Sequence, residues 1–137
     1  MTQKFYNDLT HSIVGAAIEV HEELGPGLLE GVYEKCMVHL LTCKGFKIMN
    51  QQRIPVRFKE SFLDCDLRYD LLVEDSIIVE IKAAEKILPI YEAQLMTYLK
   101  LLKKAKGIIL NFNCCNIFYE GQKTIVTKEF MNLPRGY

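Results

Sequence analysis

Two short apolar runs around a polar turn place the strongest constraint on how this chain folds. They lie in YDLLVEDSIIVEIKAAE, residues 69–85, where Leu71-Leu72-Val73 and Ile77-Ile78-Val79 flank Glu74-Asp75-Ser76. Apolar runs of this length beside a polar turn are typical of a β-hairpin with buried strands. The segment therefore predicts two neighbouring antiparallel strands in the interior of a sheet.

Three charged residues, Asp70, Glu80 and Lys82, lie inside or directly beside these runs. A buried charge costs several kcal/mol unless something compensates it. If Val73 pairs with Ile77 across a three-residue turn, Asp70 and Glu80 become direct cross-strand neighbours, with Cβ atoms about 5 Å apart. Lys82 then projects from the same face as Glu80. This arrangement depends on the register, because a slip of one residue would move the carboxylates to opposite faces.

Two interpretations of these charges follow from the hairpin. Like charges directly opposite one another destabilise a sheet unless a cation lies between them, and carboxylate oxygens are the ligands that Mg²⁺ prefers. A lysine beside them can orient a water molecule or a phosphate oxygen. Alternatively, the charges form a solvent-exposed strand end, with Glu80 and Lys82 paired along one face. The hairpin alone leaves both interpretations open.

The hydrophobic periodicity of the whole chain predicts an α/β fold. Apolar residues three and four positions apart mark helices, which end at glycine or proline, and extended apolar runs mark strands. The order ααβββαββ puts a crossover helix between the third and fourth strands, so we expect a mixed β-sheet flanked by helices. The expected helices run from about Leu9 to Gly25, from Gly27 to Lys44, and from Pro89 to Lys106; the expected strands are 46–58, with Pro55 at an edge or bulge, 65–74, 77–83, 107–112 and 124–130.

Length and composition favour one globular domain spanning residues 1–137. The 17 basic residues balance the 17 acidic ones, so any contact with nucleic acid must be local. The cluster KLLKKAKG, residues 100–107, is either such a contact or the solvated end of a helix. No apolar stretch reaches the ~20 residues of a membrane span, and residues 1–12 lack the apolar core of a signal peptide. We expect a cytoplasmic protein that does not associate with membranes.

The hairpin residues resemble a known signature. Asp70, followed after nine intervening residues by Glu80-Ile81-Lys82, resembles the D…(D/E)-x-K motif of the PD-(D/E)XK nuclease superfamily, with Tyr69 in place of the proline. The run from Gly27 to Tyr33, GLLEGVY, fits the G-x-x-E-x-x-Y pattern that names the GxxExxY protein family, a bacterial and archaeal branch of that superfamily. The preceding IVGAAIEVHEELGPGLLE is similar to the opening helix of that family. Gln94 to Tyr98 resembles the Q-x-x-x-Y helix motif of the exonuclease-like branch.

The resemblance, which covers residues 10 to 130, implies a restriction-endonuclease-like core and a metal-dependent nuclease acting on nucleic acid, with DNA the expected substrate. Asp70, Glu80 and the backbone carbonyl of Ile81 would hold one or two Mg²⁺ or Mn²⁺ ions, with Glu30 as an additional ligand. Lys82 would orient the attacking water and stabilise developing charge. Gln94 would orient Lys82 or the phosphate.

Two tyrosines accompany these residues on the expected helices. Tyr33 shares a helix face with Glu30, and Tyr98 shares one with Gln94. Both tyrosines are expected either to support the site or to pack in the core with their hydroxyls at its rim. Glu30 is either a metal ligand or an acid in the first turn that the helix dipole stabilises.

Two further alternatives remain open. The balanced charge and small size are also compatible with a non-catalytic module that binds nucleic acid or protein and retains the nuclease fold. Cys36, His39 and Cys43 lie one turn apart and could contribute to a zinc site, but a fourth ligand at suitable spacing is missing. A homodimer is compatible with either function, since nucleases that cut both strands often act as dimers.

Overall fold

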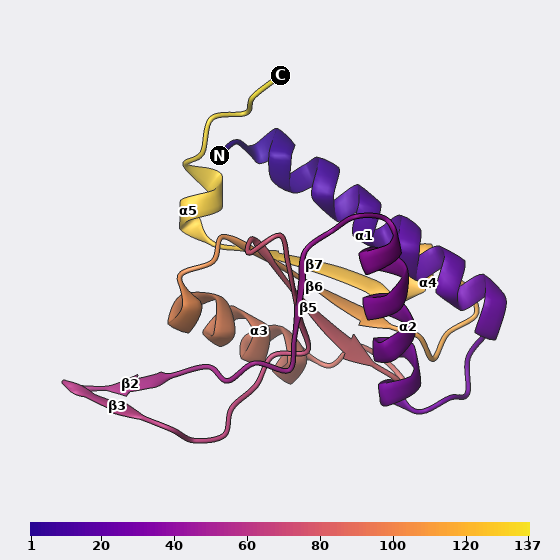
Figure 1. The fold of residues 1–137 in the computed structure, drawn as a ribbon, viewed down its shortest axis with the longest axis horizontal. Helices are drawn as coiled ribbons and strands as arrows, with labels where there is room; N and C mark the ends of the chain where they lie inside the picture. The colour runs from indigo at the N-terminus through magenta and orange to yellow at the C-terminus, as the bar shows by residue number, and fades with distance from the viewer.

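The computed structural model describes residues 1–137 and contains a central five-stranded mixed sheet (Figure 1). The strand order is β1–β4–β5–β6–β7, in which β5 and β6 are parallel and the other neighbours antiparallel. This arrangement confirms the predicted α/β fold with a mixed sheet and is consistent with a restriction-endonuclease-like core. The strands of this sheet are β1 (Ile48–Asn50), β4 (Leu71–Val73), β5 (Ile77–Lys82), β6 (Lys106–Asn111) and β7 (Gln122–Val126).

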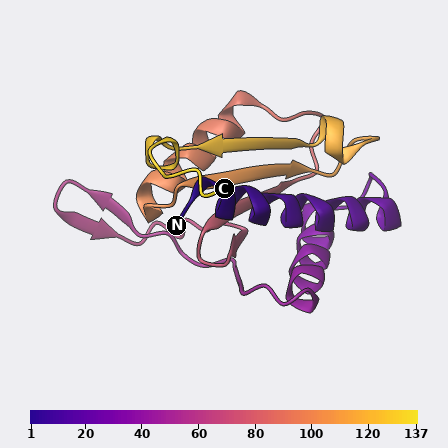
Figure 2. The ribbon, with the colours of Figure 1, turned by 90° about the horizontal axis from the view of Figure 1, so that it is seen from above.

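Helices cover both faces of the sheet, as Figure 2 shows for α1 and α3. Helices α1 (Gln3–Leu24) and α2 (Glu30–Cys43) share a hydrophobic core with Ile77, Val79 and Ile81 of β5. Helix α3 (Pro89–Leu102) packs on the opposite face, over Ile78. Because side chains alternate along a strand, Glu80 and Lys82 belong to the α3 face. Two short helices, α4 (Ile117–Glu120) and α5 (Lys128–Met131), flank β7.

The first two helices follow the predicted apolar stripes with some differences at their ends. Thr2 caps α1 by accepting a hydrogen bond from the backbone N–H of Phe5, and Gly25 ends the helix at a positive φ of 67°. Helix α2 begins at Glu30 rather than Gly27, and buries one residue per turn at Tyr33, Met37 and Leu41. Leu29 and Val32 precede or flank this narrow stripe and are exposed.

The prediction of one strand over residues 46–58 is wrong. The chain bends at Gln51, which has a left-handed φ of 53°, and forms β2 (Val56–Phe58) only after Pro55. Strand β2 pairs with β3 (Ser61–Leu63) in a separate two-stranded sheet that projects from the body (Figure 1). We call residues 56–63 the arm. The strand expected over 65–74 is correspondingly reduced to β4.

Two other boundaries near the C-terminus also differ from expectation. Helix α3 ends at Leu102 because Lys103 adopts the left-handed conformation, so Lys106 and Gly107 lie in β6 instead of closing the helix. After β7, residues 128–131 turn into α5 instead of continuing the strand, because the Thr127 side chain accepts a hydrogen bond from the backbone N–H of Phe130. None of the helices has both the length and the apolarity needed to cross a membrane.

Candidate active site

The hairpin formed by β4 and β5 has the predicted register. Val73 pairs with Ile77 and Leu71 with Val79, so Asp70 lies opposite Glu80 at the open end of the hairpin. The Asp70 N–H donates to Glu80 Oε2 at 2.8 Å, and the Ile81 N–H donates to Asp70 Oδ2 at 2.7 Å. Each carboxylate is thus fixed by the backbone of the other strand. The second oxygen of each makes no bond to the strand backbone.

Burial strongly perturbs both carboxyl groups. Glu80 is only 5% exposed, and this burial, together with the negative charge of Asp70, raises its pKa to about 8. Burial also raises the pKa of Asp70 to about 6, and the nearby carboxylate of Glu34 adds to that effect. The site therefore holds two acidic groups whose ionised forms lack sufficient positive charge around them. Such a pair is what a cation would stabilise.

Lys82 lies on the same face, at the end of β5. Its positive charge lowers the pKa of both Asp70 and Glu80, although less than burial raises them. The Lys82 ammonium makes no direct ion pair, and its Nζ lies 4.6 Å from the ring centroid of Tyr91, in the first turn of α3. A cation–π contact of this kind holds the ammonium while leaving it able to donate to a further group.

The backbone around Lys82 is held by the end of β6. The Lys82 carbonyl accepts a hydrogen bond from the N–H of Phe112 at 2.9 Å. The buried Asn111 side chain accepts from the Ala84 N–H and donates to the Ala84 carbonyl, both at 3.0 Å. These bonds fix the chain immediately after Lys82, a role that sequence reasoning did not assign to Asn111.

The structure brings two unpredicted residues, Glu34 and Gln51, to Asp70. The Gln51 Nε2 group donates to Asp70 Oδ1 at 3.0 Å and lies 2.9 and 3.1 Å from the two carboxylate oxygens of Glu34. Asn50 also donates to Glu34, at 2.9 Å. The only sequence signal for Glu34 was its place beside Tyr33 on the stripe of α2. Gln51 gave no signal beyond its polarity.

Glu30 does not join this cluster, so the acid that α2 contributes is Glu34. Glu30 is the exposed first residue of the helix, and its side chain makes no hydrogen bond or ion pair. One helical turn, about 5.4 Å along the axis, separates the two acids. The second turn of α2, not the first, is therefore level with Asp70.

Tyr33 is a core residue whose hydroxyl organises the loop before α2. It is fully buried, its ring stacks on Phe112 with centroids 4.5 Å apart, and its hydroxyl donates to the Gly25 carbonyl at 2.6 Å. The same hydroxyl accepts from the Leu28 N–H at 3.1 Å. The tyrosine of the G-x-x-E-x-x-Y pattern thus closes the loop that its glycine, Gly27, begins at a φ of 103°.

Helix α3 contributes two residues near the acids. Tyr98 is buried, and its pKa is raised by that burial and by the negative charges of Glu80 and Asp70. Gln94 is exposed and makes no side-chain hydrogen bond. It falls between Tyr91 and Tyr98 on one side of the helix, because residues three and four apart share a face. Its predicted role in orienting Lys82 is compatible with this position.

The donor chemistry of the cluster fits a hard divalent cation. Asp70 Oδ1, Glu80 Oε1 and the Glu34 carboxylate are oxygen donors of the type that Mg²⁺ and Mn²⁺ prefer. No three His, Cys, Asp or Glu side chains are grouped closely enough to hold a metal by themselves, since the Gln51 amide lies between Glu34 and Asp70. A backbone ligand such as the Ile81 carbonyl, or a shift of Gln51, would complete the set. Of the three residues that could contribute to a zinc site, only His39 and Cys43 are in contact, at 3.7 Å.

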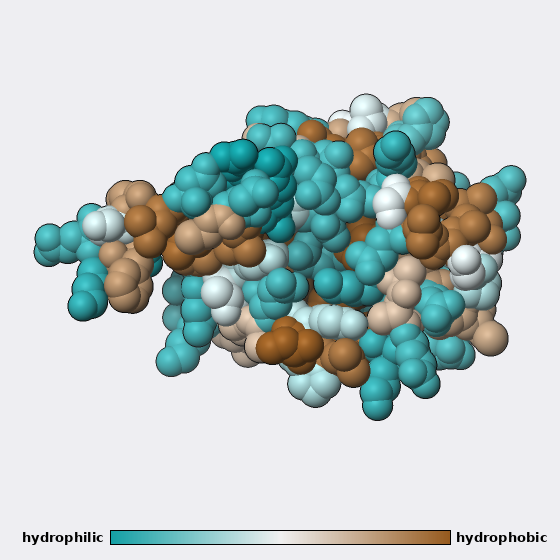
Figure 3. Space-filling model, turned by 90° about the horizontal axis from the view of Figure 1, so that it is seen from below, coloured by the Kyte–Doolittle hydropathy of each residue, from teal (hydrophilic) through white to brown (hydrophobic).

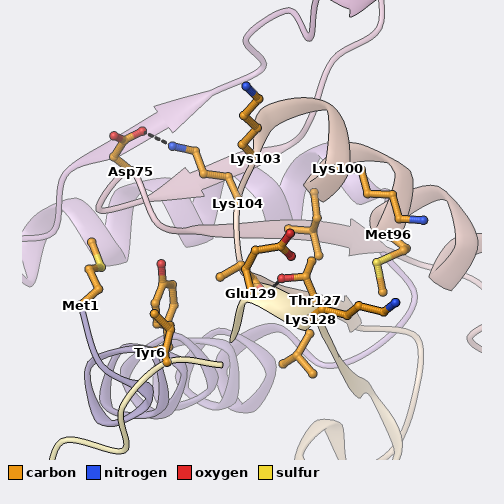
Figure 4. A pocket seen from close by; sticks show the side chains of 14 residues that line it. Met1, Tyr6, Asp75, Met96, Lys100, Lys103, Lys104, Thr127, Lys128 and Glu129 are labelled. Atoms are coloured by element: carbon orange, nitrogen blue, oxygen red, sulfur yellow. Dashed lines mark hydrogen bonds and ion pairs between the residues drawn. The ribbon is translucent and has the colours of Figure 1, made fainter. Parts of the chain in front are cut away.

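A cleft of about 1010 Å³ lies at the opposite end of the sheet (Figure 4). Its lining includes Lys100 of α3, Lys103 and Lys104 directly after that helix, and Lys128 of α5. Lys104 forms an ion pair with Asp75 at 3.0 Å. The lysine cluster expected over residues 100–107 is interrupted, because Lys106 is buried and donates to Asn7. Neither Asp70 nor Glu80 lines this cleft. We therefore place the candidate active site at the hairpin and not in this cleft.

Comparison with known proteins gives a family match over most of the chain. A family model described as the PD-(D/E)XK nuclease superfamily matches residues 7–124, which include the hairpin, α2 and α3. The searches of curated proteins and of solved structures returned no significant match. The match covers most of the chain and contains Asp70, Glu80 and Lys82 in the order of the superfamily signature. The chain belongs to the PD-(D/E)XK nuclease superfamily.

Proposed function

We propose that this protein is a metal-dependent nuclease that hydrolyses phosphodiester bonds of nucleic acid, with DNA as its substrate. The observation that carries the proposal is the buried pair of carboxylates, Asp70 and Glu80, held by each other's backbone with Lys82 on the same face. PD-(D/E)XK nucleases generally use divalent metal ions, and the oxygen donors of this pair suit Mg²⁺ or Mn²⁺.

In this proposal Asp70, Glu80 and the Ile81 carbonyl hold the ion, and Glu34 takes the place first expected for Glu30. When bound, the ion supplies a Lewis acid for the phosphate and lowers the pKa of a water molecule. Lys82, held over the Tyr91 ring, orients that water and donates to the oxygen on which negative charge develops.

The residues of α3 line the same side of the site. Gln94 donates to a phosphate oxygen or to the water that Lys82 holds. Tyr98 excludes water from the buried side of Glu80, which maintains the low dielectric in which these electrostatic interactions are strong. Tyr33 acts through the fold alone, since its hydroxyl is already bonded to Gly25 and Leu28.

The assignment to a branch of the superfamily follows the G-x-x-E-x-x-Y pattern of residues 27–33. We assign the chain to the GxxExxY branch, and with it to a bacterial or archaeal cytoplasm. A homodimer is part of this proposal, because nucleases that cut both strands of a duplex often act as dimers.

Cleavage assays with site variants test the function. Purified protein should cut plasmid or linear DNA with Mg²⁺ or Mn²⁺, and Asp70→Ala and Lys82→Ala should each lower the rate by at least 100-fold, as expected for groups that act on the transition state. The matched controls Glu22→Ala and Lys4→Ala change exposed residues of α1 and should cleave like the wild type. Undiminished cleavage by both site variants would remove the basis of this assignment.

A second function is favoured by one observation. The Gln51 amide donates hydrogen bonds to both Asp70 and Glu34, so these acids have a partner that does not require a metal. A non-catalytic module that retains the nuclease fold would keep this arrangement. Calorimetric titration with Mg²⁺ separates the two functions, because a nuclease site should show a heat of binding that Asp70→Ala abolishes, whereas the module should show none.

A further inference from the structure

The arm, residues 56–63, is an exposed two-stranded ribbon with apolar side chains on its surface. Phe62 is 70% exposed, Phe58 62% and Leu63 46%. Figures 1 and 3 show the arm projecting from the body, with hydrophobic side chains along it. An isolated two-stranded ribbon is only marginally stable in water, and clustered exposed apolar side chains mark interaction sites. The arm therefore has the character of a binding element.

Each side of the arm combines an aromatic ring with a cation. Arg57 pairs directly with Phe62 across the strands, and its guanidinium carbon lies 5.8 Å from the Phe62 ring centroid. Phe58 lies on the other side, and the Lys59 Nζ lies 5.6 Å from its ring centroid. Aromatic rings on which bases stack, next to cations that contact phosphates, are the combination by which proteins bind single-stranded nucleic acid.

The charges of the arm differ between its root and its tip. At the root Arg53 is paired with Asp64, and Arg68 with Asp66 at 3.1 Å. At the tip Arg57 and Lys59 have no acidic partner within ion-pair distance, and Arg57 Nε donates only to the Lys59 carbonyl, at 3.0 Å. Glu60, next to Lys59, also lacks an ion-pair partner, so the two cations and one acid leave residues 56–63 with a net charge of +1. This positive charge lies beside the exposed rings, where it favours a polyanion over an apolar partner.

The arm is rooted directly in the candidate active site. The segment that carries the arm begins after Gln51 and ends just before Asp70, and these two residues are joined by the Gln51 N–H donating to the Asp70 carbonyl at 2.9 Å. Ile54, which is buried under α3, donates to the Leu67 carbonyl at 2.7 Å and closes the root. A strand of nucleic acid lying along the arm therefore leads to Asp70.

The length of the arm sets where it would contact its ligand. From residue 53 to residue 58 an extended chain spans about 16 Å at roughly 3.3 Å per residue. That distance corresponds to about five stacked nucleotides at 3.4 Å each. The rings would thus meet bases about five nucleotides from the root of the arm.

We propose that the arm binds a single-stranded segment of nucleic acid that flanks the phosphate to be cut. Its bases stack on Phe62 on one side of the ribbon and on Phe58 on the other, and its phosphates are contacted by Arg57 and Lys59. This inference rests on the proposed nuclease function, because it assigns the strand to the substrate of that site. It adds a substrate class, nucleic acid with an unpaired segment, which the carboxylate site alone does not specify.

Fluorescence anisotropy with a labelled 20-nucleotide oligothymidine in EDTA tests the inference without cleavage. The double variant Phe58→Ala/Phe62→Ala should bind at least ten-fold more weakly than the wild type, since each stacked base contributes substantially to affinity. The matched control Phe118→Ala/Tyr119→Ala removes two exposed rings of α4 and should bind unchanged. Arg57→Ala/Lys59→Ala should reduce the slope of log affinity against log salt by about 1.4, as two lost phosphate contacts require.

Several outcomes would overturn the inference. The ring variant could bind the oligonucleotide with the affinity of the wild type, or the wild type could fail to bind it. The ring variant could lose affinity equally for a duplex of the same length. Light scattering could show that the ring variant converts a dimer to a monomer. The last would identify the arm as a contact between copies of this chain. If the wild type shows arm-dependent binding but no cleavage with Mg²⁺ or Mn²⁺, the arm assignment is supported and the nuclease proposal fails.

Discussion

Replacing Glu80 by glutamine should stabilise the protein while abolishing its activity. Glu80 is buried beside Asp70, and its pKa is raised to about 8 by burial and by that neighbouring charge. The Glu80→Gln side chain has nearly the same shape. Its oxygen can still accept from the Asp70 N–H, as Glu80 Oε2 does at 2.8 Å, and its amide can donate to the Asp70 carboxylate. The substitution thus replaces a repulsion by a hydrogen bond.

The magnitude follows from proton linkage. A buried acid whose pKa is higher in the folded than in the unfolded protein stabilises the fold fully when the pH is below its pKa in the unfolded protein. This contribution is lost as the pH rises toward its pKa in the folded protein. For Glu80 this window extends from 4.5 to about 8. Each pH unit within this window lowers the free energy of unfolding by about 1.4 kcal/mol. At pH 7 the wild type has therefore lost about 3 kcal/mol of unfolding free energy that the variant retains. We expect Glu80→Gln to raise the free energy of unfolding at pH 7 by up to about 3 kcal/mol.

Urea unfolding followed by circular dichroism in EDTA measures this difference. The wild type should lose stability between pH 5 and pH 8, and Glu80→Gln should lose much less. The exposed control Glu22→Gln should stay within about 0.5 kcal/mol of the wild type. Mg²⁺ at 100 times its dissociation constant should stabilise the wild type by about 2.7 kcal/mol and the variant by far less. A variant that is no more stable than the wild type at pH 8 would refute the assigned repulsion.

The remaining predictions concern residues around the site. Tyr33→Phe should lower the free energy of unfolding by about 1–3 kcal/mol, because the Gly25 carbonyl and the Leu28 N–H lose the hydroxyl to which they are bonded. The folded variant should still cleave, so urea unfolding checks the stability and cleavage assays check the activity. Gln51→Ala should tighten Mg²⁺ binding by up to about ten-fold in calorimetry, because the hydrogen bond from the Gln51 amide to Asp70 no longer competes with the ion. Weaker binding would indicate that the Gln51 oxygen is itself a ligand. Gly107→Ala should cost about 1–3 kcal/mol in thermal unfolding, because its Cβ would lie 2.8 Å from Leu95, whereas Gly15→Ala, with open space around it, should not destabilise.

The hairpin could be predicted from the sequence because its geometry is local. A three-residue turn and two apolar runs determine which residues pair, and the pairing determines that Asp70 and Glu80 meet. The crossover between β5 and β6 was predictable for a similar reason, since a helix between two strands permits a parallel pair. These features require no knowledge of distant contacts.

The arm and the role of Gln51 could not be predicted in this way. A left-handed bend is common at glycine, but at Gln51 it is stabilised by hydrogen bonds to Asp70, which lies 19 residues further along the chain. Local propensity therefore favoured one continuous strand through this position. The two strands that replace it belong to different sheets, and only the tertiary contact to Asp70 separates them.

The choice between Glu30 and Glu34 depends on where α2 sits along its own axis. Both acids adjoin the buried stripe of this helix, so periodicity cannot distinguish them. The stacking of Tyr33 on Phe112 fixes that axial position, and Phe112 in turn donates its N–H to the Lys82 carbonyl. The tyrosine of the G-x-x-E-x-x-Y pattern therefore connects α2 to the strand end that carries the site. This connection brings the residue after the tyrosine, Glu34, level with Asp70.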